Sequence, residues 1–254
     1  MFPELLTIGP ISIKSYGFFI AIGFLAALYF TQRRAKKEAL NLDIIMDLNF
    51  YLLISGIIGA RVLYVILSWD YYRNNLIEIL YVWSGGLVLY GGVITGLLAS
   101  IYYVKKNKLN YWQLADIFIA PAFLWLAIGR IGCLCAGCCY GKPATGPLGI
   151  VFSNPKSFAP LNILLIPTQI YESLFCFTLF LAGQLFYGRK KFHGQVFMLS
   201  TMLYCVWRFI IEFYRGDDRG MFLFTRLYPS QTLSIVIFAL LSGALIYLWK
   251  KNLK

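Results

Sequence analysis

The sequence QTLSIVIFALLSGALIYLW, residues 231–249, runs for 19 positions without a charged residue. A helix needs about 20 apolar residues to cross the hydrocarbon core of a bilayer, so this stretch is typical of a transmembrane span. The chain has 254 residues and is 59% hydrophobic and 13% charged. Further apolar runs of this kind lie upstream, at residues 17–31, 46–68, 86–104, 112–128, 168–187 and 195–214. The sequence therefore predicts an all-α integral membrane protein with about seven transmembrane helices, in which residues 1–254 form one polytopic membrane domain.

The basic residues predict how these helices cross the membrane. A net charge of +12 is compatible with nucleic-acid binding, but the positions of the charges favour membrane orientation and no nucleic-acid partner. Of the 23 Lys and Arg residues, 13 fall in four clusters that each follow an odd-numbered span, at 33–37, 105–108, 189–191 and 250–254. The positive-inside rule places such clusters in the cytoplasm. We therefore predict an N-terminus outside and a C-terminus in the cytoplasm.

Several ionisable and polar residues fall inside or at the ends of the predicted spans. A charged side chain at the centre of a span costs about 2.5–3.5 kcal/mol, so each needs a partner, a water-filled cavity or a functional role. With the predicted orientation they all lie in the outer half of the membrane. The charged members are Arg61, Arg130, Glu172, Arg208 and Glu212, and the polar members are Tyr16, Tyr90 and Gln169.

Two interpretations of these charges remain open at the level of sequence. Arg208 and Glu212 are four residues apart, so they share a helix face and can pair, with Tyr204 one turn earlier on the same stripe. One interpretation is a buried ion pair that only fastens helices together. The other is a phosphate site, because three arginines at similar depth exceed the nearby carboxylates and the planar guanidinium group binds phosphate oxygens in pairs. A phospholipid headgroup is the anion expected at that depth.

Cysteines dominate the segment that follows the fourth predicted span. Cys133, Cys135, Cys138 and Cys139 lie within seven residues, at the start of an outer loop predicted at about residues 131–166. Disulfides, redox catalysis, a metal site and simple packing of small residues are all compatible with this pattern. The spacing is not a standard zinc pattern and the one histidine, His193, is predicted on the cytoplasmic side, so we predict no metal ion and no cofactor.

The order and spacing of short motifs along nearly the whole chain resemble the prolipoprotein diacylglyceryl transferases of bacteria. Each motif alone is weak, but their order, their spacing and the predicted seven-span topology together are specific. The motifs are Tyr16-Gly17, Gly59-Ala60-Arg61, Ser84-Gly85-Gly86, Gly91-Gly92, Asp116, Gly129-Arg130-Ile131-Gly132, Gln169-Ile170-Tyr171-Glu172, Gly194-Gln195, the run from Tyr204 to Arg215, and Ser230-Gln231.

The resemblance implies an enzyme of lipoprotein biosynthesis in the bacterial plasma (inner) membrane, with its active site towards the outer face. It implies transfer of the diacylglyceryl group of phosphatidylglycerol to the lipobox cysteine thiol of preprolipoproteins, with release of glycerol phosphate and formation of a thioether. The partners it implies are phosphatidylglycerol, the signal peptides of preprolipoproteins and membrane lipid.

The resemblance also implies roles for site residues. Arg130 and Arg208 hold the phosphate and stabilise the leaving group, Glu212 orients Arg208, and Tyr16 and Tyr204 line the site. The catalytic set is then Tyr90, Arg130, Tyr204, Arg208 and Glu212. The substrate-binding set is Tyr16, Arg61, Cys133, Gly141, Gln169 and Glu172.

Three positions depart from the family pattern. Tyr90 stands where the family usually has a histidine, Cys133 where it has an asparagine, and Cys138 where it has an acidic residue. A neutral tyrosine, with a reference pKa near 10, is a poorer general base than histidine at neutral pH. Other hypotheses therefore remain open. They are a membrane thiol–disulfide oxidoreductase that uses the Cys133–Cys139 cluster, a diverged lipid transferase with another acceptor, and a transporter or channel that uses the intramembrane charges.

Overall fold

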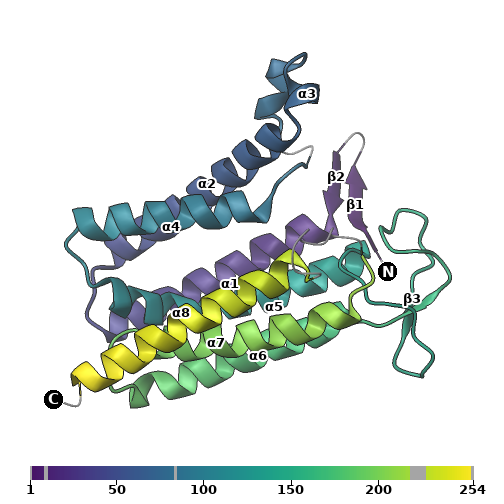
Figure 1. Ribbon diagram of the computed structural model, residues 1–254. Coiled ribbons are helices and arrows are strands. Elements are labelled where there is room, and N and C mark those ends of the chain that lie inside the picture. Colours follow the sequence, from purple (N-terminus) through teal and green to yellow (C-terminus); the bar gives the residue numbers. More distant parts are fainter. Residues whose placement is uncertain (1, 9–10, 83–84, 218–226, 253–254) are drawn as a thin grey trace. The chain divides into compact units, whose positions relative to one another are not determined.

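The computed structural model describes residues 2–8, 11–82, 85–217 and 227–252 (Figure 1). By its contacts the chain divides into two compact units, and each is described here by itself. The large unit comprises residues 1–30 and 115–254, and the small unit comprises residues 31–114. The prediction of a single domain over residues 1–254 stays a prediction.

Helices make up most of both units, as the sequence predicts. The longer helices are α1 (Ser15–Lys37), α2 (Leu42–Leu67), α4 (Leu89–Lys106), α5 (Tyr111–Ala136), α6 (Thr168–Phe186), α7 (Gln195–Ile211) and α8 (Pro229–Asn252). Short helical segments are α3 (Trp69–Tyr72), η1 (Leu76–Leu80), η3 (Tyr187–Arg189) and η4 (Glu212–Tyr214). The described residues also contain two antiparallel hairpins that the all-α expectation did not include, β1 (Glu4–Ile8) with β2 (Ile11–Lys14) and β3 (Ile150–Val151) with β4 (Leu164–Leu165).

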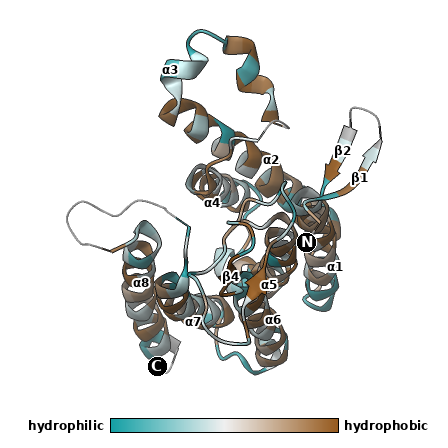
Figure 2. Cartoon of the chain, turned by 90° about the vertical axis from the view of Figure 1, so that its right-hand side faces the viewer, coloured by the Kyte–Doolittle hydropathy of each residue, from teal (hydrophilic) through white to brown (hydrophobic). Residues whose placement is uncertain are grey.

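Within the described residues, six helices are long and apolar enough to cross a membrane. In the last of them, Pro229–Lys251, only 6% of the apolar window is buried inside the protein, so its apolar side chains face outwards. Figure 2 shows hydrophobic residues, in brown, along the helices. An exposed apolar surface of this extent is stable when the solvent is lipid. The protein is therefore a multi-pass membrane protein.

The third predicted span, residues 86–104, corresponds to α4 but is not among these six. Helix α4 has 18 residues, and its last turn contains Lys105 and Lys106. The 18 residues of α4 are therefore less apolar than the most apolar 18-residue stretch of each of the six helices that qualify as spans. The count of seven and the orientation of the two termini stay predictions.

In the large unit, the helices α1, α5, α6, α7 and α8 run alongside one another (Figure 1). Side-chain bonds to backbone carbonyls fasten neighbouring helices: Trp125 Nε1 donates to Ile20 O at 3.0 Å, and Ser173 Oγ donates to Ala127 O at 2.8 Å. The buried core between α5 and α6 contains Ala120, Phe123, Leu124, Ala127, Cys176, Leu179 and Phe180. These contacts fix how far the neighbouring helices are shifted along one another. This alignment in turn sets the positions of the polar residues that lie one or two turns beyond the core on the same helices.

Asp116 on α5 holds the beginning of α7. Its carboxylate accepts from Gly194 N at 2.8 Å and Phe197 N at 2.9 Å, and Lys190 Nζ lies 3.3 Å away. The first N–H groups of a helix lack partners within the helix, so a buried carboxylate at this place stabilises the helix start. This bond network explains structurally why the sequence has an acidic residue in the middle of an apolar span.

The β1–β2 hairpin is fastened to the long loop between α5 and α6. The Glu4 carboxylate pairs with Lys14 of β2 and with Lys156 of the loop, both in the large unit. These hydrogen bonds, first that from Lys14 and then that from Lys156, lower the pKa of Glu4 below its ordinary value of 4.5. The Glu4–Lys156 ion pair therefore connects the β1–β2 hairpin with the loop between α5 and α6.

In the small unit, α2 and α4 pack at very close range. A Cβ on Gly59 would lie 2.6 Å from Gly91 O, and a Cβ on Gly91 would lie 2.6 Å from Leu63 Cβ. Thr95 Oγ1 donates to Ser55 O at 2.7 Å across the same contact. Gly59 of α2 and Gly91 of α4 thus serve close helix packing, which is typical of helix pairs in membranes.

Candidate functional site

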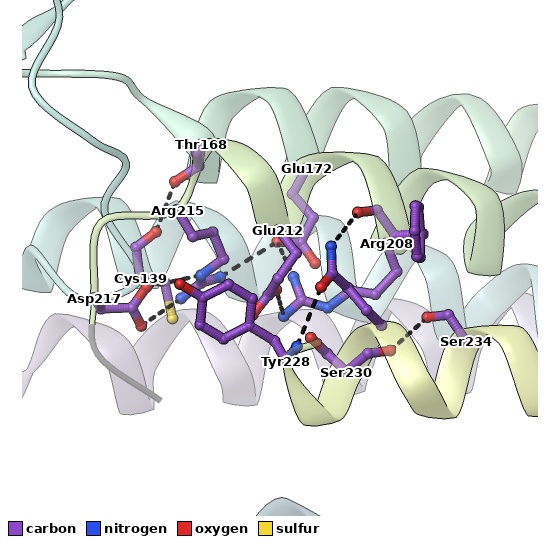
Figure 3. Close-up of polar contacts among 12 residues, drawn as sticks. Cys139, Thr168, Glu172, Arg208, Glu212, Arg215, Asp217, Tyr228, Ser230 and Ser234 are labelled. Carbon is purple, nitrogen blue, oxygen red and sulfur yellow. Dashed lines mark hydrogen bonds and ion pairs between the residues drawn. The ribbon is translucent and has the colours of Figure 1, made fainter. Parts of the chain in front are cut away.

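Three arginines from three parts of the large unit meet at one buried carboxylate, that of Glu172. Figure 3 shows two of them, Arg208 and Arg215, beside it. Arg130 Nη2 lies 2.8 Å from Glu172 Oε1, Arg208 Nη1 lies 3.8 Å from Oε2, and Arg215 Nη1 lies 3.9 Å from Oε2. The Glu172 side chain is 1% exposed. A buried carboxylate needs such partners, because an unpaired charge is strongly destabilised away from water. We name Arg130, Glu172, Arg208 and Arg215 the arginine cluster.

The expected pairing of Arg208 with Glu212 is confirmed. Arg208 lies in the last turn of α7, and its Nη2 is 2.6 Å from Glu212 Oε2. Tyr204, one turn earlier, donates from its hydroxyl to Glu172 Oε1 at 3.2 Å and packs its ring against Phe123 at 5.4 Å between centroids. Tyr204 and Arg208, predicted on one face of this helix, therefore both point at Glu172, the carboxylate that also pairs with Arg130.

The chain folds back on itself after α5 and brings the cysteines to this cluster. Helix α5 continues to Ala136, so Cys133 and Cys135 lie in its last turn and not in a loop that begins at residue 131 as predicted. Gly137 adopts the left-handed conformation with φ +78°, which ends the helix, and Cys138 N then donates to Cys133 O at 3.1 Å. The helix continues through Gly129 and Gly132, so a boundary predicted before these glycines fell short.

The Sγ atoms of Cys133, Cys138 and Cys139 all lie within 4.8 Å of one another. We name these three residues the thiol cluster. Within the described residues, which include all six cysteines, no disulfide is formed, and Cys135 is not part of the cluster. Hydrogen bonds from the other two thiols of the cluster lower the pKa of Cys139, and the neighbouring guanidinium charges add to this effect. Three convergent sulfurs are a donor set for a soft metal ion.

The beginning of α6 is fastened to the same turn. Thr168 Oγ1 donates to Cys139 O at 2.7 Å, and Gln169 Nε2 donates to Cys138 O at 2.8 Å (Figure 3 shows the Thr168 bond). Gln169 is 1% exposed, and its Oε1 has no hydrogen-bond partner among the described residues. Gln169 and Glu172 thus belong to one turn of helix that connects the thiol cluster with the arginine cluster.

Gly141 positions the segment that contains Arg215. Gly141 and Arg215 form an isolated β-bridge, and Lys142 N donates to Tyr214 O at 2.8 Å. A Cβ on Gly141 would lie 2.5 Å from Ile166 O, so a larger residue does not fit there. These contacts are a structural reason for a glycine at this position, and the predicted role of Gly141 in substrate binding stays a prediction.

Tyr16 lies at the beginning of α1, beside the end of α5. A Cβ on Gly132 would lie 3.1 Å from Tyr16 Cα, so the two backbones approach closely at the residue before Cys133 of the thiol cluster. The Tyr16 side chain is 46% exposed. Its predicted role in lining the site is compatible with this place and stays a prediction.

Arg61 and Tyr90 belong to the small unit, and so their positions are described within that unit alone. The Arg61 guanidinium donates to four backbone carbonyls, those of Glu78, Ile79, Gly85 and Gly86. These bonds hold the segment between α3 and α4 against α2. They also account for the buried charge of Arg61. Tyr90, in the first turn of α4, is 42% exposed. The predicted roles of both residues at the substrate stay predictions.

Sequence reasoning did not single out Arg215 or Asp217 as site residues, and it considered Cys139 only as a member of the cysteine cluster. Arg215 makes two charged hydrogen bonds to Asp217, from Nε at 2.8 Å and from Nη2 at 2.7 Å, and a further one to Cys139. A signal was present, since Arg215 follows Glu212 by three residues at the end of an arginine- and aromatic-rich run. Within the described residues the expected surplus of arginine is absent, because three guanidinium groups face three carboxylates, those of Glu172, Glu212 and Asp217.

The fold and this site together define a multi-pass membrane protein with a buried cluster of guanidinium groups at one end of a helix bundle, an arrangement suited to phosphate-bearing lipid. Comparison with known proteins agrees. The family model described as prolipoprotein diacylglyceryl transferase matches residues 3–249. The chain belongs to this family.

Curated relatives carry the same description. The chain is 42% identical to the phosphatidylglycerol–prolipoprotein diacylglyceryl transferase of Clostridium tetani over 223 residues, which is 87% of this chain and 88% of that protein. It is 38% identical to the second such transferase of Clostridium perfringens, over 93% of this chain and 91% of that protein. It is 34% identical to that of Dehalococcoides mccartyi strain 195, over 98% of this chain and 95% of that protein. The family that the motifs resembled is therefore confirmed.

Proposed function

We propose that this chain transfers the diacylglyceryl group of phosphatidylglycerol to the lipobox cysteine of preprolipoproteins. The observation that carries the proposal is a set of unpartnered donors in the arginine cluster. Among the described residues, Arg130 Nε, Arg208 Nη1 and Arg215 Nη1 are buried and make no hydrogen bond, although the latter two lie near Glu172. Buried donors of this kind are normally satisfied, so their presence indicates a ligand with several acceptor oxygens.

A phosphodiester is such a ligand. Arg130 and Arg208 hold its phosphate, Arg215 adds a third donor, and Glu212 keeps Arg208 in place through the 2.6 Å ion pair. Because these groups are 13%, 11% and 2% exposed, the field they exert is little screened by water. Fixed donors in a site of low dielectric stabilise charge that develops on a leaving group without rearranging during the reaction.

The reaction itself forms one carbon–sulfur bond and breaks one carbon–oxygen bond. The acceptor thiol loses its proton, and its sulfur attacks the glyceryl carbon that is bonded to the phosphate oxygen. The electron pair of the broken bond leaves on glycerol phosphate, which takes up one proton in the overall balance. The guanidinium groups act on this departing phosphate, whose negative charge increases as the bond breaks.

We further propose that the protein lies in the bacterial plasma membrane with this site at the outer face. The predicted positive-inside orientation supports this, because it places the preprolipoprotein signal peptide and the outer-leaflet lipid at the same level. Single cysteines introduced at Lys156 and at Lys250, in a variant without the native cysteines, test it with an impermeant thiol reagent on intact cells. Labelling at position 250 in place of 156 would invert the orientation.

The test of the reaction is complementation. Bacteria depleted of their own transferase express this chain, and mass spectrometry follows the gain of diacylglyceryl on a reporter prolipoprotein. Arg130→Lys and Arg208→Lys keep the charge but lose the planar fork, and should lower transfer by at least about 10-fold with normal membrane insertion. Arg73→Lys is the matched control, since Arg73 is 59% exposed and only pairs with Asp70. Normal insertion with no lipid gain from the unaltered chain would refute the proposed reaction.

Tyr90→Phe tests separately whether that hydroxyl has a catalytic role. Loss of turnover with Phe would assign one, and retained turnover would make Tyr90 a packing residue. The competing thiol–disulfide oxidoreductase is not favoured, because the relatives are named as transferases.

A further inference from the structure

The thiol cluster has the geometry of a metal-binding site that still has an open position. A tetrahedral zinc ion with bonds of about 2.3 Å to sulfur separates its sulfur ligands by about 3.8 Å. The three Sγ atoms already lie within 4.8 Å of one another, so shifts of about 1 Å or less would complete the coordination. Three sulfurs leave one tetrahedral position open, which is the pattern of catalytic zinc sites.

The backbone fixes the cluster independently of the sulfurs themselves. Gly137 at φ +78° reverses the chain, and Cys139 at φ +61° is left-handed although it is not a glycine. A non-glycine residue in this region carries strain of about 1–3 kcal/mol and persists only where its surroundings enforce it. Here the Thr168 hydroxyl and the Gln169 amide enforce it by holding the carbonyls of Cys139 and Cys138. The sulfurs are therefore brought together by the fold, as a preorganised ligand set requires.

The neighbouring charges suit thiolates. Arg130 Nη1 lies 4.0 Å from Cys133 Sγ, and Arg215 makes a hydrogen bond to Cys139. Three thiolates around a divalent ion carry a net charge of −1, and the two guanidinium groups lie at the sulfurs that carry it. Donors that bond to metal-bound sulfur belong to the usual outer shell of such sites.

We propose that Cys133, Cys138 and Cys139 bind a thiophilic divalent ion, with zinc the expected ion, and that its open position binds the acceptor thiol of the substrate protein. This proposal rests on the proposed function and extends it. Bound to the metal, the acceptor thiol releases its proton and reacts as a thiolate. The metal acts as a Lewis acid that lets the thiol ionise at neutral pH. The proton passes to water, and the departing glycerol phosphate takes up one proton in balance, so no general base is needed in a chain where tyrosine stands at the family's histidine position. Because the cluster contacts both Arg130 and Arg215, the acceptor sulfur lies beside the phosphate that leaves.

The direct test uses Co(II) as a probe of the purified protein in detergent. One equivalent should produce the sulfur-to-metal charge-transfer absorption of thiolate coordination. Cys133→Ser and Cys138→Ser should each weaken Co(II) binding by at least about 100-fold, since changes of outer-shell groups alone weaken metal binding by about 10–100-fold. Cys135→Ser is the matched control, because Cys135 lies in the same helix turn and outside the cluster. A lipobox peptide with cysteine should shift the Co(II) spectrum, and the same peptide with serine should not.

Activity measurements then separate this proposal from the proposed function. Removal of metal by a chelator should lower diacylglyceryl transfer by at least about 10-fold, and one equivalent of Zn(II) should restore it. Full transfer by metal-free protein would overturn the metal proposal and leave the transferase intact. A cysteine-dependent Co(II) shift in a protein that never transfers lipid would support the metal site and refute the proposed function. Failure of the reduced, folded protein to bind Co(II) would overturn the metal site outright.

Discussion

Replacing Glu172 by Gln should damage both the stability and the activity of this protein, because Glu172 is the carboxylate shared by three guanidinium groups. The substitution keeps the shape of the side chain and removes its charge. Arg130, whose Nη2 lies 2.8 Å from the Glu172 carboxylate, loses a charged partner. Arg208 and Arg215, whose Nη1 atoms lie 3.8 and 3.9 Å from the same carboxylate, lose its attraction as well. Removal of one partner from a buried ion pair costs about 3–5 kcal/mol, and the remaining amide oxygen places this case near the lower end.

The consequence can be measured as heat stability in detergent and as transfer rate. At about 2–4 °C per kcal/mol for a chain of this size, a loss of about 3 kcal/mol lowers the Tm by about 6–12 °C. Because the same carboxylate fixes the arginines that hold phosphate, we also expect transfer to fall by about 100-fold, as for displacements of reacting groups by about 1 Å. Asp70→Asn is the control, since its side chain is 93% exposed in a pair with Arg73.

A Tm within about 2 °C of the unaltered protein, scaled as above, together with more than half of its activity, would refute the reasoning. The three arginines would then be held by other contacts, and the charge of Glu172 would have no part in their arrangement. A lowered Tm with full activity would assign Glu172 to stability alone.

Three further predictions concern other contacts. Arg215→Lys loses the paired bonds to its carboxylate neighbour, so kcat should fall by about 10–100-fold in the transfer assay with little change in Tm. Gly91→Ala forces α2 and α4 apart and should destabilise by about 1–3 kcal/mol in thermal unfolding, whereas Gly96→Ala, with no atom within 4 Å, should not. The pKa of Glu4 is lowered by its bonds to Lys14 and the loop lysine, so the stability it contributes is present above pH 4.5 and is lost as the pH falls through the lowered value. The Tm difference between the unaltered protein and Glu4→Gln should accordingly vanish in acid, and a difference that grew in acid would contradict the assignment.

Sequence periodicity predicted the helices well because lipid imposes a simple requirement, a long apolar stretch with satisfied backbone bonds. It also predicted that Arg208 and Glu212 pair, since both lie on one helix and their spacing alone fixes the contact. Contacts between distant segments were beyond its reach. Glu172 and Arg215 are 43 residues apart, and backbone contacts such as the β-bridge of Arg215 to Gly141 bring the arginine to that carboxylate.

The predicted depth of an arginine in the membrane did not show whether it belongs to the candidate site. Arg61 was grouped with Arg130 and Arg208 because all three arginines were predicted at similar depth. In the structure its guanidinium is occupied by four carbonyls of the small unit, which accounts for the charge without a ligand. The sequence pattern could not separate an arginine that binds backbone from one that faces a ligand, because both must be buried and both must find acceptors.

The balance of charge in the site changes the physical basis of phosphate recognition. The sequence favoured a phosphate site on the grounds of surplus arginine, yet within the described residues Arg130, Arg208 and Arg215 face an equal number of carboxylates. Attraction by net charge is then weak, and recognition rests on the three buried N–H donors that make no hydrogen bond. Such donors bind a ligand more strongly when it has more acceptor oxygens and when those oxygens carry more negative charge. A phosphodiester carries one negative charge and the departing glycerol phosphate approaches two, so the same donors bind the transition state more tightly than the substrate. A neutral but unsatisfied site is thus better suited to catalysis than a strongly positive one, which would bind the intact lipid tightly and gain less when its bond breaks.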